Sequence, residues 1–267
     1  MKIQTVRAVT VVGALLILFS CEIDQGLAPL RNGIRGTISF KGKWPENTDQ
    51  VLVVASTDFP PQGISQLEIG EPLPFGVDSC EYTLYLPPGL YRAIAVIWKE
   101  KGYQWNVNNI IGVYFAGSDS LTPGQVNVPE DVLVSGINIV ANFKRARSHF
   151  ESSISGTLYF HGQWPKEAES LFVVASLVPF SFTKFPTLLD LYISGSLPVG
   201  LDSVNYEISV PPDTYRFLAV VVLEHNEPIG LSNIKGIRGE PFWGGPIVVP
   251  DNTAKVKNVD IDIYFGQ

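Results

Sequence analysis

Two segments with the same pattern of polar, apolar and proline residues dominate this sequence: Tyr82-Thr-Leu-Tyr-Leu-Pro-Pro-Gly-Leu-Tyr-Arg-Ala-Ile-Ala-Val-Ile-Trp98 and Tyr206-Glu-Ile-Ser-Val-Pro-Pro-Asp-Thr-Tyr-Arg-Phe-Leu-Ala-Val-Val-Val222. Before the prolines, the residues alternate with a period of two, which indicates a half-buried strand. The prolines have no N–H to donate to a ladder, so the chain must turn a corner there. The residues after the corner are apolar nearly throughout, as is typical of an inner strand of a sandwich. We therefore predict a hairpin in each copy, made of a strand, a Pro-Pro corner and a second strand.

Other motifs recur at nearly the same offset, so the whole chain is a duplication. Gly36-Thr-Ile-Ser-Phe-Lys-Gly-Lys-Trp44-Pro45 returns as Gly156-Thr-Leu-Tyr-Phe-His-Gly-Gln-Trp164-Pro165. Val53-Val-Ala-Ser56 returns as Val173-Val-Ala-Ser176. The predicted organisation is a signal peptide over residues 1–21, a tether over 22–32, a first domain over 33–144, a linker over 145–152 and a second domain over 153–267.

Each copy consists of short strands separated by turns. An alternating strand closes each copy, with Ile137, Ile139, Ala141 and Phe143 on one face in the first and Val259, Ile261, Ile263 and Phe265 in the second. No segment shows the period of a convincing amphipathic helix. The pattern predicts an all-β fold of two tandem antiparallel β-sandwich domains, each of about seven strands. Trp44 and Trp164, each beside a proline, are expected to cap the two cores.

Each copy begins with Gly-x-Ile/Leu-x-Phe and continues with Asp-x-x-x-Tyr-x-Leu/Ile-x-Leu/Val-Pro-Pro-x-x-Tyr, a pattern that resembles carboxypeptidase regulatory-like domains. The resemblance implies a transthyretin-like sandwich of the kind found in bacterial envelope proteins, used for adhesion, spacing or ligand presentation without catalysis. The glycine that this family often carries before the aromatic is absent, since Glu81 and Asn205 stand there. Fibronectin type III domains, with a similar Leu-x-Pro-x-x-x-Tyr corner, are the alternative, although the spacing here is one residue shorter.

The N-terminus has the pattern of a signal peptide, with Lys2 and Arg7 followed by an apolar stretch over Ala8–Phe19 that is short for a membrane span. It ends in Leu18-Phe19-Ser20-Cys21, which resembles the bacterial lipoprotein lipobox and implies cleavage before Cys21 and its acylation, for example with palmitate. The alternatives are an ordinary signal peptide or an uncleaved anchor. Several acyl chains would anchor the protein stably, because each buried methylene contributes about 0.8 kcal/mol.

Charge and cysteine content limit the kinds of partner and the kinds of site that this protein can have. Glu22 follows the cysteine, which by the enterobacterial sorting rule favours the outer membrane, so we expect a lipid-anchored envelope protein on its periplasmic or surface-exposed face. Without the signal peptide, 17 of the 19 basic residues remain against 26 acidic ones, a surface that repels nucleic acid. If Cys21 is acylated, Cys80 is the one cysteine left, which leaves no intrachain disulfide and no cysteine metal site.

The sequence contains no pattern typical of catalysis. His149, His161 and His225 are expected in the linker, on a solvated strand face and at a turn, and no nucleophile elbow, zinc spacing, phosphate loop or EF-hand is present. We predict no cofactor, no metal and no enzymatic activity. Asp78 and Asp202 recur at equivalent positions; we expect their side chains to set a turn, with a calcium site as the alternative.

The candidate contact residues are aromatic and lie in loops or in an insertion. Trp98, Tyr103 and Trp105 flank a turn in the first copy, and Phe242 and Trp243 lie in a glycine-rich loop of the second. Such rings stack on a sugar or a partner protein, or fold back as loop anchors. Phe182 and Phe185 lie in the apolar insertion Leu177–Leu197 of the second copy, for which covering a sandwich edge is favoured over exposing a docking patch.

The expected function is a membrane-anchored, non-catalytic binding or scaffolding module for an envelope protein or a glycan. The alternative is a carbohydrate-binding accessory lipoprotein of a glycan-uptake system, with Trp105 and Trp243 as stacking rings.

Overall fold

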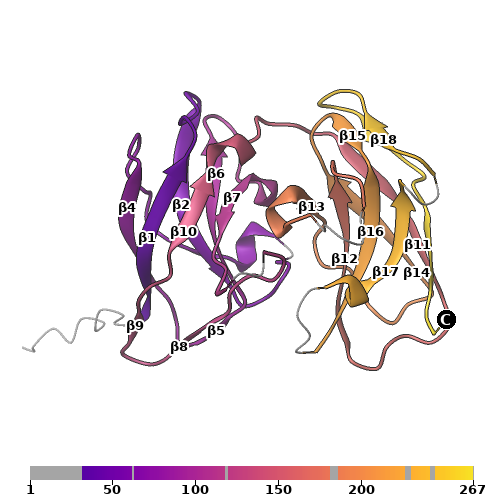
Figure 1. Ribbon diagram of the computed structural model, residues 1–267, viewed down its shortest axis with the longest axis horizontal. Helices are drawn as coiled ribbons and strands as arrows, with labels where there is room; N and C mark the ends of the chain where they lie inside the picture. Colours follow the sequence, from indigo (N-terminus) through magenta and orange to yellow (C-terminus); the bar gives the residue numbers. More distant parts are fainter. Residues whose placement is uncertain are drawn as a thin grey trace, which may run out of the picture. The chain divides into compact units, whose positions relative to one another are not determined.

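A computed structural model describes residues 32–61, 63–117, 120–180, 186–225, 230–240 and 244–266. This part of the chain is all-β and sandwich-like, with short strands and single-turn helices (Figure 1). Every strand pair in it joins two strands of the same copy, so residues 33–142 and 153–264 each build their own sheets. No helix among the described residues has the length and apolarity needed to cross a bilayer.

The first copy forms two four-stranded sheets and a two-stranded ribbon. One sheet has the order β10-β1-β4, with β9 also on β1; the other has the order β3-β2-β6-β7, and the ribbon is β5-β8. The strands are β1 (Gly33–Lys41), β2 (Thr48–Ser56), β3 (Glu68–Ile69), β4 (Ser79–Tyr85), β5 (Gly89–Tyr91), β6 (Ala93–Glu100), β7 (Ile110–Val113), β8 (Val126–Val128), β9 (Leu133–Val134) and β10 (Ile139–Asn142).

The second copy repeats this arrangement. Its sheets have the orders β14-β11-β19, with β20 also on β11, and β13-β12-β16-β17, and its ribbon is β15-β18. The strands are β11 (Ser153–His161), β12 (Ala168–Ser176), β13 (Leu191–Ile193), β14 (Ser203–Ser209), β15 (Asp213–Tyr215), β16 (Phe217–Glu224), β17 (Ile234–Gly239), β18 (Ile247–Val249), β19 (Lys255–Val256) and β20 (Ile261–Tyr264). The single-turn helices of both copies are η1 (Ile64–Gln66), η2 (Val107–Asn109), η3 (Phe143–Arg145), η4 (Leu188–Asp190) and η5 (Leu231–Asn233).

The predicted hairpin is wrong. The strand before the Pro-Pro corner, β4, pairs with β1, whereas the strand after it, β6, pairs with β2 in the other sheet. The second copy repeats this crossing, with β14 on β11 and β16 on β12. Two consecutive residues without an N–H interrupt the ladder, so the chain leaves one sheet and enters the other instead of folding back on itself. The corner therefore joins the two layers of each sandwich.

Tyrosines fix this corner to the core, as their position in the repeat suggests. The Tyr91 hydroxyl donates to the carbonyl of Pro87 at 3.1 Å, and Tyr215 donates to Pro211 at 2.7 Å. Both rings are buried. Trp44 and Trp164 cap the cores as predicted: their rings lie 4.8 and 4.5 Å from Phe40 and Phe160. Each indole N–H donates to a main-chain carbonyl at 3.0 Å.

The closing strand of each copy runs parallel to the first strand, an orientation that the alternating pattern does not predict. β10 pairs with β1 in parallel, with Ile38 opposite Ile139, and β20 pairs with β11 in the same way. The chain reaches this position through Ile137, whose N–H donates to Arg35 and whose carbonyl accepts the hydroxyl of Tyr82 at 2.8 Å. In the second copy Val259 and Tyr206 make the equivalent bond at 2.6 Å.

Gly36 permits this contact because it has no side chain. It lies opposite Tyr82 in the sheet, and a Cβ at its position would be 2.1 Å from the carbonyl oxygen of Ile137. At Gly156 the equivalent separation, to the carbonyl oxygen of Val259, is 2.3 Å. Any larger residue would push the closing segment away from the first strand. The glycine of the recurring Gly-x-Ile/Leu-x-Phe motif is thus a packing requirement.

Accordingly, we expect Gly36→Ala to lower the free energy of unfolding by at least about 2 kcal/mol, since the added methyl group collides with backbone that has little freedom to move. Urea denaturation of the purified protein measures the change. Gly63→Ala is the control, because a Cβ there meets nothing within 4 Å, and it should change stability by less than about 0.5 kcal/mol. Equal effects of the two substitutions would contradict the close approach at Ile137.

Candidate functional site

The outer face of one sheet in each copy is buried, although a sandwich core needs only the inner face. In the first copy these outward residues of β2, β6 and β7 form an apolar cluster: Leu52, Val54, Ala95, Ile97 and Val113. In the second copy the outward residues of β12 and β16 form another: Phe172, Val174, Phe217, Ala219 and Val221. This second buried face explains why the strands after the Pro-Pro corner are apolar nearly throughout.

Each copy supplies residues that cover the other's outer face. Leu188 of the second copy is 6% exposed and belongs to the cluster on the first copy's sheet. Phe59 of the first copy packs on the second copy's sheet, with its ring edge-on to Phe172 at 6.3 Å. We call this shared apolar region, formed by the two clusters and the residues that cover them, the junction.

The insertion of the second copy builds much of the junction. Its β13 pairs with the edge of β12, which confirms the predicted edge cover for these residues. The helix η4 of the insertion also contacts the first copy. The Leu188 side chain packs in the first copy's cluster, and the Leu188 N–H donates to the carbonyl of Ser120 at 2.8 Å. The insertion therefore covers an edge of its own sandwich and joins it to the other copy.

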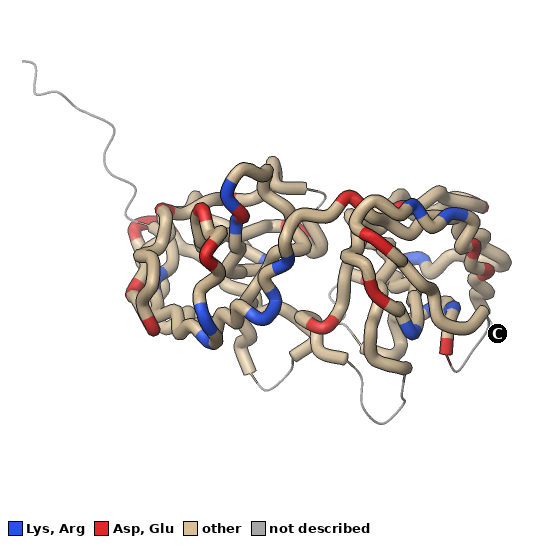
Figure 2. Tube along the Cα trace, turned by 90° about the horizontal axis from the view of Figure 1, so that it is seen from above, with Lys and Arg blue, Asp and Glu red and all other residues tan. Residues whose placement is uncertain are grey.

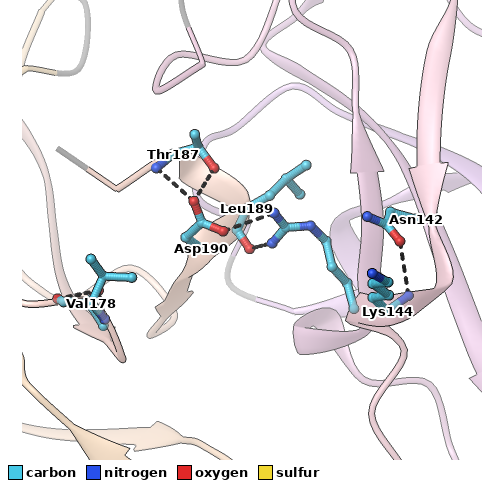
Figure 3. A network of polar contacts seen from close by, with 8 residues as sticks. Asn142, Lys144, Val178, Thr187, Leu189 and Asp190 are labelled. Carbon is cyan, nitrogen blue, oxygen red and sulfur yellow. Dashed lines mark hydrogen bonds and ion pairs between the residues drawn. The ribbon is translucent and has the colours of Figure 1, made fainter. Parts of the chain in front are cut away.

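Polar contacts at the junction centre on Asp190. Its carboxylate accepts from the N–H and hydroxyl of Thr187 at 3.1 and 2.7 Å (Figure 3). It also forms an ion pair with Arg145 at 2.9 Å, and Arg145 donates to the carbonyl of Leu189 as well. Burial alone would raise the pKa of Asp190, but these hydrogen bonds and the Arg145 charge outweigh it and hold the pKa below its ordinary value.

Two further polar contacts join the copies. Arg92 of the first copy forms an ion pair with Glu169 of the second at 3.1 Å. The side-chain amide of Asn108 donates to the carbonyl of Ser209 at 2.9 Å. Residues 31–267 form one compact unit, and these contacts with the apolar junction account for its continuity.

The second copy also carries exposed rings on the solvent face of its other sheet. Tyr159 and Tyr264 are 40% and 55% exposed, and the Tyr264 ring stacks on His161 at 4.6 Å. His161 Nε2 lies 2.8 Å from Asp262, which is opposite Tyr159 in the sheet. We call Tyr159, His161 and Tyr264 the ring strip. The first copy has Ser39, Lys41 and Asn142 at the matching positions, so the strip is specific to the second copy.

The predicted contact residues of the first copy have three different surroundings. Trp98 is 1% exposed and its indole donates to the Thr48 hydroxyl at 2.8 Å, so it is a core residue and its proposed role as a surface contact is corrected. Tyr103 is exposed and stacks on His149 at 4.2 Å. Trp105 is partly buried against the junction, with the Lys99 ammonium 5.7 Å from its ring centre. Trp98 faces inward because it lies within β6, on the same face as the core residues Ile94 and Val96.

The other predicted contact residues, Phe182, Phe185, Phe242 and Trp243, lie outside the described residues, as does Cys21. Sequence reasoning missed the ring strip because its members come from two strands that are about a hundred residues apart. The signal that could have found it is the difference between the copies at His161 and Tyr264, since the surrounding motifs are otherwise repeated.

The recurring aspartates act through their backbone. The carbonyls of Asp78 and Asp202 accept the N–H groups of Phe40 and Phe160 at 2.8 and 2.9 Å, whereas neither carboxylate forms a hydrogen bond within the described part of the chain. The predicted side-chain role is therefore wrong. Cys80 lies partly buried against the first core, as expected, and burial raises the pKa of its thiol.

Charged residues of both signs are interspersed along the two copies (Figure 2). In the described ranges, no three residues of the types His, Cys, Asp and Glu lie close enough together to hold a metal ion.

Comparison with family models gives no match, and no curated protein matches in sequence. Among solved structures, a leucine-rich repeat protein from Bacteroides thetaiotaomicron shares 11% identity at a TM-score of 0.34 over 88% of this chain, which spans 26% of that protein. A candidate adhesin from Bacteroides ovatus shares 11% identity at a TM-score of 0.22, over 84% of this chain and 92% of that one. A major pilin of Streptococcus pyogenes shares 11% identity at a TM-score of 0.19, over 88% of this chain and 98% of that one. Likenesses at such TM-scores carry neither a family nor a function over to this chain.

The Asp190 contacts predict a pH-dependent contribution to stability. Asp190→Asn should lower the free energy of unfolding at pH 7 by on the order of 1 kcal/mol, a figure already reduced because more than a third of the side chain is exposed. Since the folded-state pKa lies below the unfolded value of about 3.9, this contribution is complete above that value and is lost as the pH falls through the folded pKa.

Urea denaturation of the wild type and Asp190→Asn from pH 7 to pH 3 measures this difference, which should shrink in the acid range. Asp202→Asn is the control, because that exposed carboxylate forms no hydrogen bond with the described residues. A constant difference between wild type and Asp190→Asn across the whole pH range would show that the carboxylate charge plays no part.

Proposed function

We propose that this chain is a lipid-anchored protein of the bacterial cell envelope that acts as a non-catalytic binding or scaffolding module. The observation that carries the proposal is the junction. It makes one compact unit of two small sandwiches, which suits a protein that holds a surface or a partner at a fixed distance from a membrane. The carboxypeptidase regulatory-like pattern of the two copies supports the same role.

Acylation at Cys21 is the part of this proposal that can be tested first. The wild type should incorporate an alkyne-tagged palmitate and sediment with the membrane fraction, whereas Cys21→Ala should do neither, because it removes the thiol that carries the lipid. Cys80→Ala, which changes the partly buried second cysteine, should behave as the wild type. Membrane association that persists unchanged in Cys21→Ala would exclude the lipid anchor.

A second candidate function is glycan binding within a glycan-uptake system. The ring strip favours it, because exposed planar rings with neighbouring polar groups on the solvent face of a sheet provide both stacking faces and hydrogen-bond partners. Trp243 stays a predicted stacking residue, whereas Trp105 is already engaged with Lys99 and the junction.

For glycan binding, we expect Tyr264→Ala to weaken any glycan found on an array by up to about tenfold, the value of one lost stacking contact. Tyr85→Ala is the matched control, because Tyr85 is equally exposed, on β4 of the first copy. A titration followed by intrinsic fluorescence gives the two affinities. Absence of array binding, or equal affinities of both variants and the wild type, would remove the ring strip as a glycan site.

A further inference from the structure

The junction contains a cavity of about 270 Å³ that is lined by both copies. Its walls are mainly apolar, with Phe59, Leu67 and Val113 from the first copy and Leu188 and Tyr192 from the second. An apolar cavity of about 150 Å³ is enough to bind benzene. The larger space here can hold an apolar group bigger than benzene.

Two arginines line this cavity, and their surroundings differ. The guanidinium of Arg145 is engaged by Asp190 and by the carbonyl of Leu189. Arg147 is half-buried, and its one hydrogen bond to a described residue comes from its main-chain N–H, which donates to Asn109 at 2.8 Å. Its guanidinium has no hydrogen bond or ion pair within the described residues.

The charge of Arg147 is therefore not balanced at the cavity. Among the described residues, the charged groups that line it are Arg145, Arg147 and Asp190, and Arg145 and Asp190 neutralise each other. One positive charge remains, in a chain whose formal net charge is −7. A guanidinium beside apolar walls has lost part of its hydration, so an anion with planar, two-oxygen geometry is the partner that it binds best.

We propose that the cavity binds a small amphipathic carboxylate, with its apolar body against Leu188 and Val113 and its carboxylate paired with Arg147. This site goes beyond the proposed function, since neither anchoring nor scaffolding requires it. The apolar walls supply most of the affinity, and Arg147 supplies the discrimination between an acid and an uncharged molecule of the same length. A ligand recognised through its apolar body alone is the competing possibility that the experiment separates.

Octanoate and octan-1-ol are suitable probes, because they share a chain of eight carbons and differ in charge. The full chain carrying Cys21→Ala is titrated with each by calorimetry, so that no acyl chain or detergent competes for the cavity. Octanoate should bind at least about tenfold more tightly than octan-1-ol, since a hydrogen bond to a charged group is stronger than one between neutral groups.

Arg147→Met should abolish this tenfold preference and leave the affinity for octan-1-ol unchanged. Arg35→Met is the matched control, because Arg35 is exposed on β1 of the other sheet, and it should keep the preference. If an arginine variant fails to fold, methyl NMR of the protein that keeps both arginines gives an independent result. Octanoate should shift the methyl signals of Leu188 and Val113 and not those of the core residue Ile38. No saturable octanoate binding, equal affinities for the two probes, or a preference retained in Arg147→Met would each overturn the proposal.

Discussion

The carbonyl oxygen of Ile137 is the point at which three segments of the first sandwich meet. It lies against the bare backbone of Gly36 and accepts the hydroxyl of Tyr82, while the Ile137 N–H bonds to Arg35. These contacts place the closing strand beside the first strand, and without them a buried hydroxyl and a buried carbonyl would both lack partners. Because Val259, Gly156 and Tyr206 repeat the contacts, each copy closes its own core.

The junction forms on the outer faces of strands whose inner faces build the two cores. Once both copies have closed, β2, β6, β12 and β16 still present apolar residues outward, which a lone sandwich would expose to water. The insertion with Leu188 covers the outer face of the first copy, and the loop with Phe59 covers that of the second. The copies have thus diverged where they touch each other and kept their motifs where each must fold alone.

The repeated motifs predicted the fold class, the core faces and the tryptophan caps, because each depends on residues that are close in sequence. They misassigned the Pro-Pro corner, since two alternating segments look alike whether they pair with each other or with other strands. The ring strip and the cavity were missed for a related reason. His161 stacks on Tyr264, and Arg147 and Leu188 line one cavity, only because the fold brings distant stretches of chain together.

The parallel alignment of β1 and β10 has a mechanical consequence. A pull on the N-terminal end of β1 and on the C-terminal end of β10 acts along the strands in opposite directions. Because the hydrogen bonds of the pair lie across that direction, such a force loads them together in shear and cannot peel them one after another. The same holds for β11 and β20. Tension applied between the two ends of either sandwich therefore loads the hydrogen bonds of this strand pair in shear.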